Sequence, residues 1–110
     1  MTKGRWIILL AAVPLLALAM AWIQRRLEPH GVTLTWQAPP PKPGVNVAGY
    51  NIYRRTADGG PFVKIAARVL TSPYEDRLVS RGRTYYYVVT TVDQNDRESR
   101  FSSEAKAEIP

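Results

Sequence analysis

The segment that most constrains the fold is residues 82–93, which read GRTYYYVVTTVD. After the glycine, nearly every residue is aromatic, β-branched or threonine, a composition that favours a β-strand over a helix. Tyr85, Tyr87 and Val89 fall on one face of such a strand, and the residues between them fall on the other. Because both faces are largely apolar, we expect a central strand with a neighbour on each side.

The chain has the length of one small domain and lacks the residues that several kinds of site need. It has 110 residues, no cysteine and a single histidine, His30. Disulfides, thiolate metal sites and zinc sites with several imidazoles are therefore excluded. A serine–histidine–carboxylate triad is also not expected, because the histidine lies in a short linker.

The carboxylate-rich stretches at 75–76 and 93–96 are typical of solvated turns. The second stretch has oxygen ligands suited to calcium but lacks a complete binding loop. Gly59-Gly60 is not followed by the lysine and helix of a phosphate-binding loop. We expect no catalytic, cofactor or metal site, and hence a protein that is not an enzyme.

The net charge of +6 is concentrated beside an N-terminal apolar run. Four of the 15 basic residues flank this run, and all 9 acidic residues lie beyond it, so the remainder carries 11 basic residues against 9 acidic ones. Both signs are mixed along that remainder. Nucleic-acid binding needs a clustered basic face, so we expect no nucleic-acid partner.

Residues 6–23, WIILLAAVPLLALAMAWI, are an unbroken run of 18 uncharged residues. A helix that spans a bilayer needs about 20 apolar residues, with a range of about 17–25. The tryptophan at each end suits the membrane–water interface, and bilayer helices tolerate a proline such as Pro14. We expect residues 1–26 to form an N-terminal hydrophobic helix that contacts the membrane through residues 6–23, with residues 27–110 as the folded domain.

Two interpretations of this leader stay open. Residues 17–19 and 19–21 both match the small-x-small pattern of a cleaved secretory signal. Arg25 and Arg26 would hinder export just past such a site, whereas they suit the far headgroups of an uncleaved signal-anchor. We favour the anchor, with the domain outside the cytoplasmic membrane; cleavage would leave a secreted or periplasmic protein.

Beyond the leader, further segments alternate as strands do and are separated by turn-forming residues. Val32, Leu34 and Trp36 alternate with two threonines, and the stretch PPPKPG ends this segment. Six short strands with no helical pattern after residue 26 predict an all-β, immunoglobulin-like sandwich. The remaining strands are expected at 47–55, 62–65, around 74, at 82–93 and at 105–109.

These segments resemble the fibronectin type III family, in the form common in bacterial envelope and secreted proteins. The matching pieces, in family order over residues 32–110, are VTLTW, GYNIYR, GGPFVKI, YED, GRTYYYVVTTVD and ESRFSSE. The resemblance makes Tyr85 the corner tyrosine, whose hydroxyl bonds back to the preceding turn, and places Val79 where the family usually has leucine. The structural core that it implies contains Trp36, Tyr50, Ile52, Tyr85, Tyr87 and Val89.

One departure from the family concerns its first strand, for which only residues 27–31 are available. If the helix reaches Arg26, that strand is missing and the strand at 32–36 becomes a sheet edge with unpaired N–H and C=O groups. Such an edge invites a strand from another chain, so Thr33 and Thr35 mark a candidate surface for a partner or for self-association. Shielding by the linker or by headgroups is the alternative.

The leading hypothesis is a non-catalytic module that mediates protein–protein interaction at the cell envelope through strand edges, loops and exposed aromatic residues. The alternative is a glycan- or surface-binding accessory module of a larger envelope or enzyme complex, in which tyrosines and arginines form a platform. An aromatic row on one exposed face would favour the second hypothesis, and an open apolar edge the first. The candidate platform residues are Tyr53, Tyr86, Arg54 and Arg55.

Overall fold

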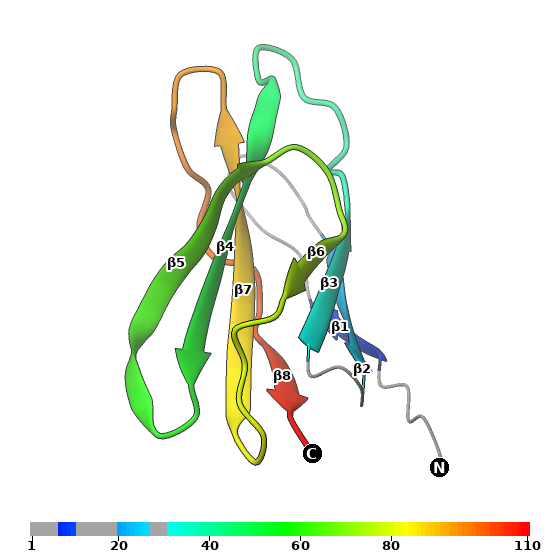
Figure 1. Ribbon diagram of the computed structural model, residues 1–110. Coiled ribbons are helices and arrows are strands. Elements are labelled where there is room, and N and C mark those ends of the chain that lie inside the picture. The colour runs from blue at the N-terminus through cyan, green and yellow to red at the C-terminus, as the bar shows by residue number, and fades with distance from the viewer. Residues whose placement is uncertain (1–6, 11–19, 27–30) are drawn as a thin grey trace.

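The computed structural model describes residues 7–10, 20–26 and 31–110, and its side chains are described for residues 31–110. The described strands form two four-stranded sheets that face each other (Figure 1), in the orders β1-β2-β3-β6 and β5-β4-β7-β8. The all-β prediction is therefore confirmed. The strands are β1 (Ile7–Leu10), β2 (Met20–Arg26), β3 (Gly31–Gln37), β4 (Val47–Thr56), β5 (Gly59–Val69), β6 (Tyr74–Asp76), β7 (Thr84–Asp93) and β8 (Ala105–Glu108).

The core lies between the two sheets and follows the alternation of the sequence. In β3, Val32, Leu34 and Trp36 are buried while the two threonines between them are only partly covered. The Trp36 ring meets the Tyr50 ring edge-on, with centroids 5.3 Å apart. The six residues that the family resemblance assigns to the core all lie in one buried cluster: Trp36, Tyr50, Ile52, Tyr85, Tyr87 and Val89. Val79 packs against this cluster.

Strand β7 is an inner strand, with β4 on one side and β8 on the other. At its start, the Tyr85 hydroxyl accepts a hydrogen bond of 2.9 Å from the backbone N–H of Ser80. This contact ties the turn before β7 to the strand, which is the geometry of a tyrosine corner. From Tyr87 to Asp93 both faces of the strand are buried.

A helix is expected over residues 6–23, but the residues of this run that the structure describes are in strands, at Ile7–Leu10 and Met20–Arg26. Residues 1–6, 11–19 and 27–30 lie outside the described residues, but β1 and β2 are extended and pair antiparallel with each other. Among the residues described, no helix is long and apolar enough to cross a bilayer. The physical reason is that an unpaired edge of β3 would leave a row of N–H and C=O groups without partners, and β2 supplies those partners.

The open edge expected at β3 is therefore closed. β2 pairs with β3 from Met20 opposite Gln37 to Arg26 opposite Gly31, and β6 pairs along the other side. Thr33 and Thr35, expected to mark a docking edge, lie in an inner strand. The pairing uses the last four residues of the apolar run, so a helix that holds these residues in a bilayer and this strand pairing exclude each other.

A buried carboxylate links the two sheets. Asp76, at the end of β6, is 3% exposed. Its Oδ2 atom accepts hydrogen bonds from the Tyr87 hydroxyl at 2.7 Å and from Arg54 Nη1 at 2.8 Å. Burial and the hydrogen bond to Asp76 raise the pKa of Tyr87. Burial alone would lower the pKa of Arg54, but the hydrogen bond and the charge of Asp76 outweigh it and raise that pKa.

Gly49 is required by a close approach of two strands. A Cβ atom at this position would lie 2.8 Å from Cα of Arg68, which sits in an irregular part of β5 with φ of 53°. The backbone there is held by a 3.1 Å hydrogen bond from Arg68 N–H to Asn51 Oδ1. Gly49→Ala is therefore expected to lower the free energy of unfolding by about 1–3 kcal/mol, the usual cost of overpacking.

Gly31→Ala is the matched control for that measurement, made by urea unfolding. Its added Cβ atom would lie 3.2 Å from Oε2 of Glu75, the end of a flexible side chain that can move away. We expect this variant to unfold within about 0.5 kcal/mol of the parent, as substitutions without a specific clash usually do. Equal effects of the two substitutions would contradict the account of Gly49.

Candidate functional site

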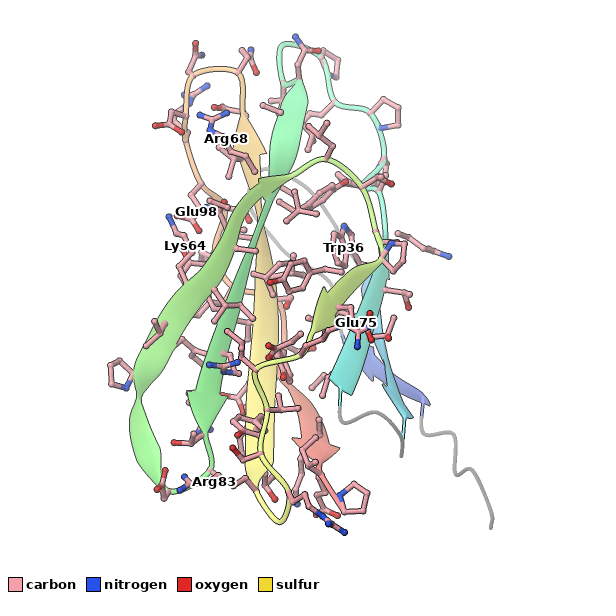
Figure 2. The ribbon with its side chains drawn as sticks, viewed as in Figure 1. Trp36, Lys64, Arg68, Glu75, Arg83 and Glu98 are labelled. Atoms are coloured by element: carbon pink, nitrogen blue, oxygen red, sulfur yellow. The ribbon has the colours of Figure 1, made fainter. Side chains whose placement is uncertain are left out.

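The outer face of the sheet β5-β4-β7-β8 carries a row of aromatic and charged side chains. Strand register places Tyr53 beside Lys64 on β5 and Val88 on β7. Two residues further along β4, on the same face, Arg55 lies beside Tyr86. Lys64 and Glu98 lie together on this side of the molecule, away from Trp36, which lies between the sheets (Figure 2).

Three rings pack against one another on this face. We call Tyr53, Phe62 and Phe101 the outer aromatic cluster. The ring centroids of Tyr53 and Phe101 are 4.9 Å apart at an interplanar angle of 53°, and those of Phe62 and Phe101 are 5.4 Å apart at 69°. Tilted and edge-on contacts of this kind are favourable arrangements of aromatic quadrupoles. Phe101 is the shared member, and it is 46% exposed.

Cationic side chains cover several of the neighbouring ring faces. The Arg55 guanidinium lies 4.3 Å from the centroid of the Tyr86 ring and 5.3 Å from that of Phe62. Lys64 Nζ lies 5.9 Å from the centroid of Tyr53. Cation–π contacts of this type contribute about 0.5–1 kcal/mol at exposed sites. They fix the rings in place and also occupy the face of Tyr86.

Two serines hold the segment that carries Phe101 against β7. Ser99 N–H donates to the carbonyl of Thr91 at 2.9 Å, while Ser99 Oγ accepts from Thr91 N–H at 2.9 Å. Ser102 makes the same pair of bonds to Val89, at 3.0 Å each. Side-chain oxygens thus replace the ladder carbonyls of a regular strand. The backbone between the serines is released from the ladder, and Phe101 lies on the outer face.

Glu98 is positioned by two hydroxyl groups. Its Oε2 atom accepts hydrogen bonds from the Tyr53 hydroxyl and, at 2.6 Å, from Thr90 Oγ1. Partial burial would raise the pKa of Glu98, but these hydroxyl donors outweigh it and hold that pKa below its usual value. Burial and the hydrogen bond to Glu98 raise the pKa of Tyr53 to about 12. At neutral pH the carboxylate is therefore ionised and the phenol is protonated.

A shallow, open depression lies at this point of the outer face. Its volume is about 700 Å³. We call it the Phe101 hollow. It is lined by Tyr53, Glu98, Ser99, Arg100 and Phe101.

The residues expected to form a platform separate into two groups. Tyr53, Tyr86 and Arg55 come together on the outer face. Arg54 does not, because its side chain points inward to Asp76. Sequence reasoning missed Phe62, Phe101 and Glu98. The signal for Phe101 was a lone aromatic residue between serines in SRFSS, but its place beside Tyr53 depends on how that segment lies along β7.

The turn after β7 is closed by a buried carboxylate. Asp93 is 1% exposed, and its Oδ1 atom accepts hydrogen bonds from the N–H groups of Arg97 at 2.8 Å and Asn95 at 2.9 Å. In the part of the chain that the structure describes, no three histidine, aspartate or glutamate side chains are grouped to hold a metal ion.

Comparison with known proteins identifies the family. No family model matches the chain. A solved structure of an Fn3-like protein from Clostridium thermocellum matches with a TM-score of 0.60 and 38% sequence identity, over 73% of this chain and 77% of that one. The chain belongs to the fibronectin type III-like family. The twitchin kinase region from C. elegans, at 23% identity and a TM-score of 0.64, covers 73% of this chain and 14% of its own and shares the fold.

Parts of much larger enzymes also match this fibronectin type III-like chain. An amylopullulanase from Thermoanaerobacter thermohydrosulfuricus is 47% identical over 58 residues, which is 53% of this chain and 4% of the enzyme. One from Thermoanaerobacterium thermosulfurigenes is 41% identical over 59 residues, 54% of this chain and 3% of the enzyme. The chain thus spans only a few per cent of the length of the curated relatives that it matches.

The two serines of this fibronectin type III-like domain are expected to contribute to its stability. Ser99→Ala or Ser102→Ala would leave a buried N–H group of β7 without its acceptor, at a cost of about 1–3 kcal/mol in the free energy of unfolding. Urea unfolding at unchanged m-value measures this cost. Ser80→Ala, which removes an exposed hydroxyl, is the control. Serine variants as stable as that control would show that these bonds contribute nothing.

Stability of the domain is expected to depend on pH through Asp93. Hydrogen bonds from the backbone N–H groups of Arg97 and Asn95 outweigh desolvation and lower the pKa of Asp93. A carboxyl group whose folded pKa lies below its unfolded value stabilises the fold above the unfolded pKa of about 4 and loses this contribution as pH falls through the folded pKa.

Thermal unfolding between pH 7 and pH 2 measures this contribution. Asp93→Asn should be less stable than the parent at pH 7, and the difference should shrink below about pH 4 as the parent's carboxylate is protonated. Glu108→Gln, which removes an exposed carboxylate at the end of β8, is the control. A constant difference between parent and Asp93→Asn over the whole pH range would contradict the role given to Asp93.

Proposed function

We propose that this chain is a non-catalytic accessory module of a glycan-degrading enzyme system at the cell envelope. The match to amylopullulanases carries the proposal: 41–47% identity is confined to 58–59 residues, 3–5% of each enzyme. A domain is typically 50–250 residues long, so a match of this extent fits an appended module better than a complete catalytic domain. The relatives' name describes enzymes that act on amylose and pullulan.

The structure supports the accessory hypothesis over docking through a strand edge. An open edge was the feature that would have favoured docking, and β2 covers the edge of β3. An aromatic row on one exposed face was the feature that would favour a glycan-facing module. The outer aromatic cluster, with Phe101 46% exposed, provides it.

The proposal includes the location of the module outside the cytosol. The apolar run at 6–23 and its basic flanks support export as a signal-anchor or as a cleaved signal. Insertion or removal of this run would take residues of β2 away from β3, so the structural support for the accessory proposal rests on the outer aromatic cluster and not on the closed edge. An anchored module would stay at the envelope, and a cleaved one would be secreted or periplasmic. In either form the domain meets polysaccharide outside the cytoplasmic membrane.

A second candidate function is protein docking by the same face. Tyrosine, phenylalanine and arginine are enriched at the centres of protein–protein interfaces, and Tyr53, Phe101 and Arg55 lie together on the outer face. In this form the module would hold a hydrolase at the envelope rather than a polysaccharide.

One experiment tests the accessory role in both forms. The full chain, isolated from its native membrane in detergent, is run through native gels that contain amylose, pullulan or xylan, and proteins that co-purify with it are identified by mass spectrometry. We expect retardation by amylose or pullulan, or stoichiometric recovery of a glycoside hydrolase. A chain that is retarded by none of the glycans and recovers no glycoside hydrolase would overturn the proposal.

A further inference from the structure

The Phe101 hollow presents one exposed aromatic ring on a fixed backbone. Ser99 and Ser102 flank the ring in sequence, and each makes two hydrogen bonds to the backbone of β7. The rings of Tyr53 and Phe62 both pack against that of Phe101. A contact residue that is already ordered loses little conformational entropy when a ligand binds. Phe101 is therefore preorganised for contact although it is nearly half exposed.

The charges of the hollow favour a neutral ligand. Glu98 and Arg100 line the same depression and carry opposite charges. Because these two charges offset each other, the pair does not favour a polyanion or a polycation. An uncharged ligand with many hydroxyl groups can use both, because a carboxylate accepts and a guanidinium donates hydrogen bonds.

The shape of the hollow favours a chain that lies across the surface. Its volume of about 700 Å³ falls within the range of ligand sites, about 300–1,000 Å³. Sites for compact small molecules enclose most of the ligand, whereas this depression is open. A polymer that is longer than the depression can rest in it and extend past its rim.

We propose that the Phe101 hollow binds a linear, uncharged glucan, with one pyranose ring stacked on the face of Phe101. The axial C–H groups of a glucopyranose form an apolar face that matches the electron-rich face of an aromatic ring. Glu98 and Arg100 meet the equatorial hydroxyls at the rim of that sugar. The inference rests on the proposed accessory function and adds to it a site and a ligand class.

Tyr86, expected to be part of a sugar platform, does not take part in stacking. The Arg55 guanidinium, 4.3 Å from its centroid, already covers the ring. A sugar could stack there only after displacing a cation from the π-face, at the cost of the cation–π contact. The binding ring is Phe101, which the sequence analysis did not select.

Affinity measurements on three full-chain variants test the site, with maltoheptaose as the probe in isothermal titration calorimetry. Phe101→Ala should weaken binding about tenfold, which corresponds to about 1.4 kcal/mol. Phe101→Trp, which keeps a larger aromatic face, should bind at least as tightly as the parent. Leu78→Ala is the matched control, because Leu78 is an 81% exposed apolar side chain outside the hollow, and it should bind as the parent does.

The outcomes separate the site from the function. If Phe101→Ala binds maltoheptaose as tightly as Leu78→Ala, the hollow is not the binding site, while the accessory function stands. If the parent binds dextran sulfate but not maltoheptaose, the neutral-ligand inference is overturned. If the parent binds neither but recovers a glycoside hydrolase, the glucan inference fails while the accessory function stands. Circular dichroism of each variant establishes that loss of binding is not loss of fold, and Phe101→Trp keeps the test decisive if Phe101→Ala does not fold.

Discussion

One buried carboxylate joins the two sheets by hydrogen bonds. Asp76 stands at the end of β6 in one sheet and accepts hydrogen bonds from Arg54 and Tyr87, which belong to β4 and β7 of the other. Asp76 is buried and Arg54 is partly exposed, so removing Arg54 would leave a buried carboxylate without its ion-pair partner and destabilise the fold. The hydrophobic core lies between the sheets, and Asp76 adds hydrogen bonds that join β6 to β4 and β7.

The outer face depends on the position of β4 and β7, because these two strands also carry its side chains. Arg54 on β4 and Tyr87 on β7 point inward to the carboxylate, and the alternation of each strand turns their neighbours Tyr53 and Val88 outward. The hydrogen bonds of Ser99 and Ser102 to the backbone of β7 then hold Phe101 on the outer face of these strands. The surface therefore has the property that a recognition site needs, with side chains held in place before a ligand arrives.

The sequence predicted what depends on local alternation and missed what depends on distant partners. The inward-facing residues of β7 follow from its pattern alone, because the two-residue alternation of a strand determines which side chains face the opposite sheet. Arg54 is expected on the surface because the local pattern does not reveal its partner, Asp76, which lies 22 residues away in the other sheet. Phe101 was missed because residues 98–102 carry no strand pattern. The apolar run at 6–23 fits a bilayer helix by composition, and pairing to β3 competes with that conformation.

The most direct test of the account is where a glucan perturbs the domain in solution. Two-dimensional ¹H–¹⁵N spectra of the labelled full chain in detergent micelles can be recorded as maltoheptaose is added. We expect the amide shifts of residues 98–102 and of Tyr53 to change, while those of β3 stay constant. Shifts confined to β3, or no shifts at saturating glucan, would contradict the claim that the outer face of the β5-β4-β7-β8 sheet is the functional surface.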